Sequence, residues 1–233
     1  EILSPGCVTA LAVGPGLGQG TDARDLLKQA LSTDLPLVLD ADALNLLAAH
    51  PVVAKQVRRR TAATLITPHP LEAARLLGLE VGALQADRLH AAIALSGKLN
   101  AVTLLKGCGS IIVLPSGSWY INSSGNPGMA SAGMGDVLTG LAAALLAQGW
   151  EAGPALLCAV HLHGVAHGQP RRHLGSGPRR RRGGRRAVVV GRPGLDPARR
   201  LPLDRPRDRA RGLQRRRRSA AREPEGRARP ARL

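Results

Sequence analysis

The chain has 233 residues and a formal net charge of +17, with 28 glycines and no phenylalanine. This length fits one domain with its own hydrophobic core, and its apolar runs are too short to cross a bilayer. The three cysteines show no paired spacing, which argues against a disulfide-stapled secreted domain and favours a cytoplasmic location.

The positive charge is confined to the last part of the chain. Residues 1–168 hold 10 Lys+Arg and 11 Asp+Glu, a net charge of −1, whereas residues 169–233 hold 23 Arg and 5 Asp+Glu, a net charge of +18. We expect 169–233 to be a disordered tail, because its Arg/Pro-rich sequence has almost no apolar periodicity. The tail is either a basic arm that binds nucleic acid or the product of a GC-rich gene translated out of frame. We favour the frameshift, because lysine is absent from the tail, and therefore predict no nucleic-acid partner and no membrane partner.

Up to residue 168, short apolar strands alternate with helices. The predicted strands are residues 8–13, 37–39, 64–66, 102–105, 111–114 and 118–121. The predicted helices are residues 21–32, 42–49, 71–77, 85–96, 136–147 and 154–167. This order predicts an α/β fold with a parallel sheet covered on both faces, in which ligands bind beyond the carboxyl ends of the strands.

The first two strand ends carry glycines and carboxylates. The turn Gly14-Pro-Gly-Leu-Gly18 lets the backbone approach a ligand closely, although a tight strand-to-helix connection would use the same glycines. The next strand ends at Asp40 and Asp42. We expect Asp42 to be the N-cap of the following helix, and Asp40 to be available for a metal or substrate role.

The next two strand ends carry a histidine and a lysine. In Thr67-Pro-His-Pro70 the two prolines stiffen the turn and fix the direction of His69. Glu72 then falls in the first helical turn, where it either caps the helix or helps to hold a hydrated Mg²⁺. Lys106 ends the next strand, before Gly107, and is either a phosphate ligand or an ordinary surface lysine.

The long stretch from Asn126 to Gly140 is the most specific motif. Its sequence, Asn-Pro-Gly-Met-Ala-Ser-Ala-Gly-Met-Gly-Asp-Val-Leu-Thr-Gly, places Gly133, Gly135 and Asp136 at the start of an apolar helix. The free amides at a helix start bind anions, and phosphate is the natural guest. Asp136 is then either a helix N-cap or a carboxylate beside an electrophilic phosphorus.

Three of these stretches, residues 13–18, 67–73 and 126–140, together resemble the ADP-dependent NAD(P)H-hydrate dehydratases, which are ribokinase-like enzymes of nicotinamide nucleotide repair. The resemblance covers about residues 8–168 and implies a ribokinase-like three-layer α/β/α fold with a mainly parallel sheet. It implies the ADP-dependent dehydration of the S epimer of hydrated NADH and NADPH, with release of AMP and phosphate. The alternative is a ribokinase-like kinase acting on hydroxymethylpyrimidine or hydroxyethylthiazole.

The resemblance also implies residue roles. Asp136 would be the general base and contact the substrate, together with Gly16, Gly18 and His69. ADP would be held by the turn after Lys106 and by the glycine loop; the implied nucleotide-binding residues are Lys106, Gly107, Cys108, Gly109, Ser110, Gly133 and Gly135. Glu72 matches the acid that organises Mg²⁺. The partners implied are a second copy of the chain in a homo-oligomer and an epimerase domain or protein.

Two departures from the family pattern bear on activity. A further N-terminal strand and helix and a Tyr-x-Gly-Ala-type substrate loop are expected before residue 8, so the domain formed by residues 1–168 is predicted to be N-terminally incomplete. The final helix expected after Gly168 is replaced by the Arg-rich tail. We therefore expect this chain to show little dehydratase activity by itself.

Overall fold

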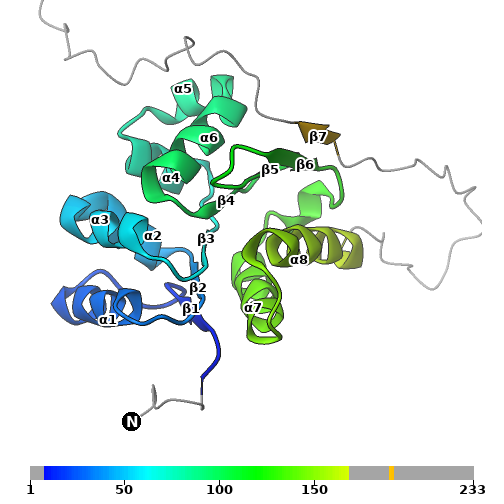
Figure 1. The fold of residues 1–233 in the computed structure, drawn as a ribbon. Coiled ribbons are helices and arrows are strands. Elements are labelled where there is room, and N and C mark those ends of the chain that lie inside the picture. The colour runs from blue at the N-terminus through cyan, green and yellow to red at the C-terminus, as the bar shows by residue number, and fades with distance from the viewer. Residues whose placement is uncertain (1–7, 168–188, 192–233) are drawn as a thin grey trace, which may run out of the picture. The chain divides into compact units, whose positions relative to one another are not determined.

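The structure is a computed structural model that describes residues 8–167 and 189–191. Its strands are β1 (Leu11–Val13), β2 (Leu37–Leu39), β3 (Thr64–Ile66), β4 (Val102–Leu105), β5 (Ser110–Val113), β6 (Trp119–Asn122) and β7 (Val189–Gly191). Its helices are α1 (Thr21–Leu31), α2 (Asp42–Ala49), α3 (Pro51–Arg59), α4 (Pro70–Leu77), α5 (Val81–Ala86), α6 (Arg88–Leu99), α7 (Met134–Ala147) and α8 (Ala152–His167), with a short 3₁₀ turn, η1 (Pro127–Met129). The alternation of strands and helices is confirmed (Figure 1).

The strands form one sheet in sequence order, β1 to β7. The first four run parallel, and β4, β5, β6 and β7 pair antiparallel in turn. The predicted hairpin is therefore present as β5 and β6. Because β1 to β4 point the same way, the loops that follow them all leave the sheet at the same edge.

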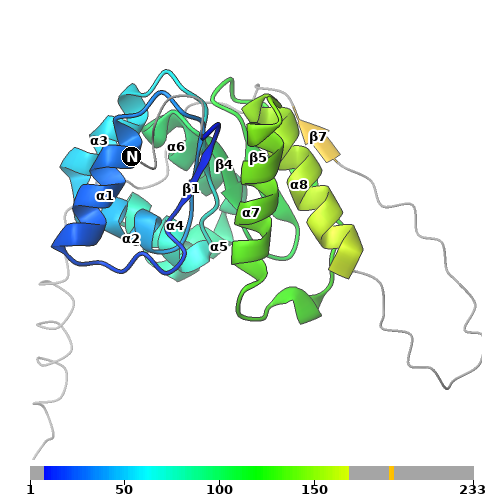
Figure 2. The same cartoon turned by 90° about the horizontal axis from the view of Figure 1, so that it is seen from below.

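Each face of the sheet has its own hydrophobic core. Leu37 and Leu39 of β2 pack with residues of α1 to α6, whereas Val38 between them packs with residues of α7 and α8. The same alternation holds in β5, where Ile111 and Val113 join the first core and Ile112 joins the second. Helices therefore cover both faces, with α1 to α3 on one side and α7 and α8 on the other (Figures 1 and 2). The predicted three-layer α/β/α fold is confirmed.

The structure contains two helices that the sequence analysis did not predict, α3 and α5. Helix α3 begins at Pro51 and buries Val53 and Val57, one turn apart, which is a narrow apolar stripe on a helix rich in Lys and Arg. Helix α5 has only six residues. Its presence moves the start of α6 from the predicted residue 85 to Arg88, because the Asp87 carboxylate caps α6 by accepting the His90 N–H at 3.3 Å.

Some predictions fall outside the described residues. The structure says nothing of residues 1–7, and of the predicted tail it describes only β7. Residues 189–191 pair with β6 as a strand, which differs from the disorder predicted there, whereas for the rest of 169–233 the disordered-tail and frameshift interpretations stay predictions. Within the described part of the chain, the helices are too short or too polar to cross a membrane.

Candidate active site

The loops after β1, β2, β3 and β4 carry most of the predicted site residues. Gly14–Gly18 follows β1, Asp40 follows β2, His69 follows β3 and Lys106 follows β4. Parallel strands place these loops at one edge of the sheet, as expected for a ligand site in an α/β fold. Helix α7 then brings the glycine loop to the same edge.

The centre of this edge is a buried ion pair. Lys106 Nζ lies 2.8 Å from Oδ1 of Asp40, whose side chain is only 2% exposed. The second oxygen, Oδ2, accepts a hydrogen bond of 2.9 Å from the Thr139 hydroxyl on α7. Because both carboxylate oxygens have a donor, Asp40 is a satisfied buried charge that ties β2, β4 and α7 together.

Gly135 lies directly against this pair. A methyl group at its Cα would lie 3.4 Å from both Asp40 Oδ2 and Lys106 Nζ. Two sequence-predicted nucleotide residues, Lys106 and Gly135, are therefore neighbours although they are 29 positions apart in the sequence. A phosphate placed at the start of α7 would meet backbone amides and the Lys106 ammonium together.

Asp136 is not the N-cap of α7. The N-cap is Gly133, in the left-handed conformation with φ of 82°, and it offers no side-chain cap. Asp136 is in the first helical turn with an exposed side chain. The helix dipole stabilises its carboxylate there, and solvent or a substrate can reach it.

The Thr67–Pro70 turn orients His69 and Glu72 through reciprocal capping. His69 Nδ1 accepts hydrogen bonds from the N–H groups of Leu71 and Glu72, and Glu72 Oε2 accepts one of 2.8 Å from the His69 N–H. Glu72 Oε1 lies 3.2 Å from His69 Nε2. The backbone of this turn is also bonded to the backbone of Lys106, because the Pro68 carbonyl accepts the Lys106 N–H at 2.9 Å.

Burial shifts both side chains toward their neutral forms. Burial lowers the pKa of His69, with a further lowering from the nearby Lys106 ammonium, which favours the neutral ring that accepts hydrogen bonds through Nδ1. Burial also raises the pKa of Glu72, although the His69 N–H partly offsets this. The structure thus assigns Glu72 a capping role, whereas its predicted role at Mg²⁺ stays a prediction. Within residues 8–167 no three His, Cys, Asp or Glu side chains cluster as a metal site.

The Gly14–Gly18 loop is held by Asp42. A side chain at Gly14 would place its Cβ 1.7 Å from the Asp40 carbonyl oxygen, so only glycine fits where β1 and β2 end. Gly18 N–H donates to Asp42 Oδ2 at 2.8 Å. The prediction that Asp42 is the N-cap of α2 is therefore wrong: the N-cap is Ala41, and the Asp42 carboxylate faces the glycine loop instead.

Gly16 and Gly18 keep the space around them open. Each has a positive φ, 68° and 80°, and a Cβ on either would meet no atom within 4 Å. These two glycines are therefore required by backbone conformation and not by crowding, and they leave room at the surface for a ligand.

The turn after Lys106 is compact and glycine-rich. The Ser110 hydroxyl accepts the Gly107 N–H at 3.3 Å and donates to the Gly107 carbonyl at 2.9 Å. Cys108, between the two glycines, is an exposed free cysteine. The five predicted nucleotide residues of this segment thus form one continuous turn next to the ion pair.

Sequence reasoning missed two features of this site, the Thr139 hydroxyl and the pairing of Asp40 with Lys106. Thr139 shares a helix face with Gly135, four positions earlier, and is a buried hydroxyl in an otherwise apolar helix, which could have marked it. The partner of Asp40 could not be read from the sequence, because it depends on which strand ends meet.

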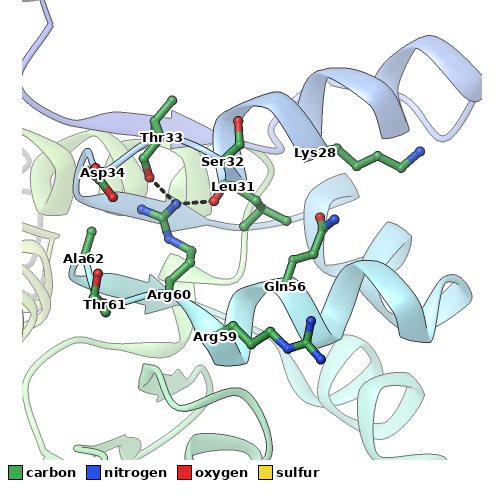
Figure 3. A pocket seen from close by; sticks show the side chains of 10 residues that line it. All are labelled: Lys28, Leu31, Ser32, Thr33, Asp34, Gln56, Arg59, Arg60, Thr61 and Ala62. Atoms are coloured by element: carbon green, nitrogen blue, oxygen red, sulfur yellow. Dashed lines mark hydrogen bonds between the residues drawn. The ribbon is translucent and has the colours of Figure 1, made fainter.

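A cavity of about 310 Å³ lies at the opposite edge of the sheet (Figure 3). Its lining comes from the last turns of α1 and α3 and from the segments that lead into β2 and β3, at the amino ends of the strands, and includes Lys28, Asp34, Gln56 and Arg60. Arg60 is structural: its guanidinium donates to the carbonyls of Leu31, Thr33 and Leu35, each at 2.6 Å, and so closes the end of α1. The chemistry-bearing residues lie at the other edge, so we place the active site there and not in this cavity.

The fold defines a ribokinase-like domain, with a glycine-rich loop at the start of α7. A structure from Bacillus subtilis, an ADP/ATP-dependent NAD(P)H-hydrate dehydratase co-crystallised with ATP/Mg²⁺, is 34% identical with a TM-score of 0.58, covering 67% of this chain and 53% of that one. Residues 3–172 match the NAD(P)H-hydrate dehydratase family. The chain therefore belongs to the NAD(P)H-hydrate dehydratase family.

Two curated relatives show how much of a whole protein is present. The ADP-dependent (S)-NAD(P)H-hydrate dehydratase of Neisseria meningitidis is 43% identical over 161 residues, which are 68% of this chain and 54% of that protein. The bifunctional NAD(P)H-hydrate repair enzyme of Moorella thermoacetica is 44% identical over 169 residues, 72% of this chain and 31% of that protein. The chain thus spans about half of the first relative and a third of the second. A hydroxyethylthiazole kinase from Pyrococcus horikoshii is 17% identical with a TM-score of 0.50, which shows a shared fold alone.

Proposed function

We propose that this chain catalyses the ADP-dependent dehydration of (S)-hydrated NADH and NADPH to NADH and NADPH, with release of AMP and phosphate. Family membership supports the reaction class. The observation that carries the assignment to this site is the contact of Gly135, at the start of α7, with Lys106 and Asp40. Because of this contact, the amides at the start of α7, the Lys106 ammonium and the exposed Asp136 lie near one another, where a transferring phosphoryl group would bind.

The chemistry accounts for this arrangement. Hydroxide is a poor leaving group, so the ring hydroxyl is first phosphorylated by ADP. Asp136 takes the hydroxyl proton as general base, the oxygen bonds to the terminal phosphorus, and the bond from that phosphorus to AMP breaks. Loss of phosphate from the ring carbon, with a proton from the adjacent carbon, then restores the dihydropyridine.

The remaining predicted residues divide between the two ligands. The turn Lys106–Ser110 and the amides at Gly133 and Gly135 would hold ADP, because they present an ammonium group and glycine amides to a phosphate. His69 and the open loop with Gly16 and Gly18 would contact the hydrated dinucleotide. Support for this division is that the His69 side chain is about half exposed, so its ring can meet a ligand.

Magnesium is expected with the nucleotide, but Glu72 does not fit as a direct ligand in its present arrangement. One of its oxygens accepts the His69 N–H, the other lies beside His69 Nε2, and burial favours the protonated form. Mg²⁺ retains several waters and binds largely through substrate phosphates. We therefore assign no catalytic step to Glu72.

A single-turnover assay tests the proposed function. The chain, in excess over (S)-hydrated NADH, is mixed with ADP, and the return of NADH absorbance is followed together with AMP. Enzyme in excess makes even the slow turnover expected of this chain measurable. NADH that forms only with ADP, in step with AMP, supports the proposal. Phosphorylation of a hydroxymethylpyrimidine by ATP, with no NADH formed, would establish the kinase alternative.

Asp136→Asn tests the assignment of the general base. The substitution keeps the size of the side chain but removes its basicity, so we expect dehydration to fall by about two to four orders of magnitude. ADP affinity, measured by calorimetry, should change by less than about threefold, because the side chain is exposed and caps nothing. A collapse of ADP affinity with no change in the single-turnover rate would contradict the assignment.

Homo-oligomerisation, an epimerase partner and a cytoplasmic location remain proposals. The bifunctional relative supports a second activity that works beside this one. Light scattering of the purified chain would determine its oligomeric state.

A further inference from the structure

Arg88, the first residue of α6, is bound to the turn that follows β4. Its NH1 donates to the Cys108 carbonyl at 2.6 Å, and its NH2 lies 3.3 Å from the Lys106 carbonyl and 3.4 Å from the Leu105 carbonyl. Within the described residues its buried Nε has no hydrogen-bond partner. The guanidinium therefore binds the backbone of this turn and not a carboxylate.

These contacts fix which way the amides of the turn point. In a trans peptide the C=O and the next N–H point in opposite directions, and the described residues contain no cis peptide. Holding the carbonyls of Lys106 and Cys108 toward Arg88 therefore turns the N–H groups of Gly107 and Gly109 away from it. Gly109, with φ of 66°, is then free to present its amide on the side opposite the guanidinium.

The glycine at position 107 matches this arrangement. A Cβ there would lie 2.7 Å from Arg88 NH2, and the residue has φ of 148°, which other residues rarely adopt. Crowding by the guanidinium and the backbone conformation both call for glycine. The turn and Arg88 are thus shaped for each other.

We infer that Arg88 is a positioning residue for nucleotide binding, which orients the Gly109 amide toward the phosphates of a nucleoside diphosphate without touching it. This inference rests on the proposed function, because it takes that turn as part of the ADP site. Arg88 leaves the hydrated dinucleotide untouched, so its effect is confined to the nucleotide half of the reaction.

The experiment compares Arg88→Met and Arg88→Lys in the whole chain, with Arg58→Met, an exposed arginine of α3, as the matched control. Hydrogen exchange of the 105–110 segment reports the order of the turn, and calorimetry reports ADP affinity. We expect Arg88→Met to speed exchange in this segment and to weaken ADP binding by about tenfold or more, a usual size for loss of an orienting group. Arg88→Lys keeps one donor group, so its exchange rate and ADP affinity should lie between those of the native chain and of Arg88→Met. In both variants the KM for the hydrated dinucleotide should stay within about twofold of the native value.

A second pair of variants tests the mutual fit. Gly107→Ala in the native chain meets both the guanidinium and the strained φ, whereas in an Arg88→Met background only the φ remains. The two substitutions should therefore be less than additive in their effect on ADP affinity. Normal exchange and normal ADP affinity in Arg88→Met would overturn the inference alone. A native chain that binds no ADP would overturn the proposed function, and with it the nucleotide role of Arg88.

Discussion

Replacing Lys106 by Met tests the buried ion pair at the centre of the site. The change removes the ammonium 2.8 Å from Asp40 Oδ1 and leaves the buried carboxylate with the Thr139 hydroxyl as its side-chain donor. Removing one partner of a buried pair costs about 3–5 kcal/mol of unfolding free energy, because the other charge stays desolvated. The Lys106 side chain is 22% exposed, so water can partly replace it, and we expect about 3 kcal/mol.

Three further variants show whether the loss of stability in Lys106→Met comes from the unpaired Asp40 charge. Thr139→Val removes a neutral donor only and should cost about 1–2 kcal/mol. Asp40→Asn combined with Lys106→Met removes both charges and should regain at least half of the loss caused by Lys106→Met. Lys55→Met, an exposed lysine of α3, should stay within about 0.5 kcal/mol of the native chain.

Urea unfolding followed by circular dichroism gives the unfolding free energy of each variant, provided that its slope against urea concentration is the same for all variants. Lys106→Met that is no less stable than Lys55→Met would show that the ion pair contributes nothing to stability. A double variant less stable than Lys106→Met would show that the uncompensated Asp40 charge is not the cause of the loss.

Three other predictions concern single contacts. Gly14→Ala should cost at least roughly 3 kcal/mol in the same urea assay, because its Cβ would overlap the Asp40 carbonyl, and stability equal to the native chain would show that the two strand ends separate easily. Arg60→Met should lower the unfolding free energy by about 2–4 kcal/mol through loss of the carbonyl contacts that close α1, with no change in ADP affinity. Burial lowers the pKa of His69, so the stability given by the neutral ring is complete above its ordinary value of 6.5 and is lost as pH falls below it. His69→Asn, a cap that does not titrate, should flatten the pH dependence of stability in that range, and an unchanged pH profile would contradict this.

The three-layer fold could be predicted because β2, β3 and β4 are mainly apolar runs without polar alternation, and each is buried along its whole length. Leu37, Val38 and Leu39 are all buried, which fits a strand covered on both faces but not an exposed edge. Helix α3 escaped prediction for the opposite reason, since its two buried valines leave too weak a period to distinguish it from a loop. An element is thus easier to predict from its apolar pattern when a larger fraction of its residues is buried.

The site was predictable as a set of turns, but not as a set of contacts. Proline and glycine mark where each turn lies, because they act through local backbone geometry. The Asp40–Lys106 pair joins residues 66 positions apart, and Thr139 is a further 33 along the chain. Their meeting depends on β3 separating β2 from β4 and on α7 returning to the same sheet edge, which no local pattern encodes. Arg88 belongs to the same class, since its partners are backbone carbonyls with no sequence signature.

The two readings of Asp136, helix cap or catalytic carboxylate, differ by three residues of register. A cap would need Asp136 to precede the helix, with its oxygens turned back onto the first amides. Gly133 instead takes the N-cap position, and its positive φ starts the helix without using a side-chain acceptor. The Met134 N–H donates to the Ser131 carbonyl, and the amides of Gly135 and Asp136 are left for an outside anion, while the Asp136 side chain is exposed to solvent. Under the proposed function, a glycine at the N-cap therefore leaves one short loop with amides that can bind a phosphoryl group and with an exposed carboxylate that can act as base.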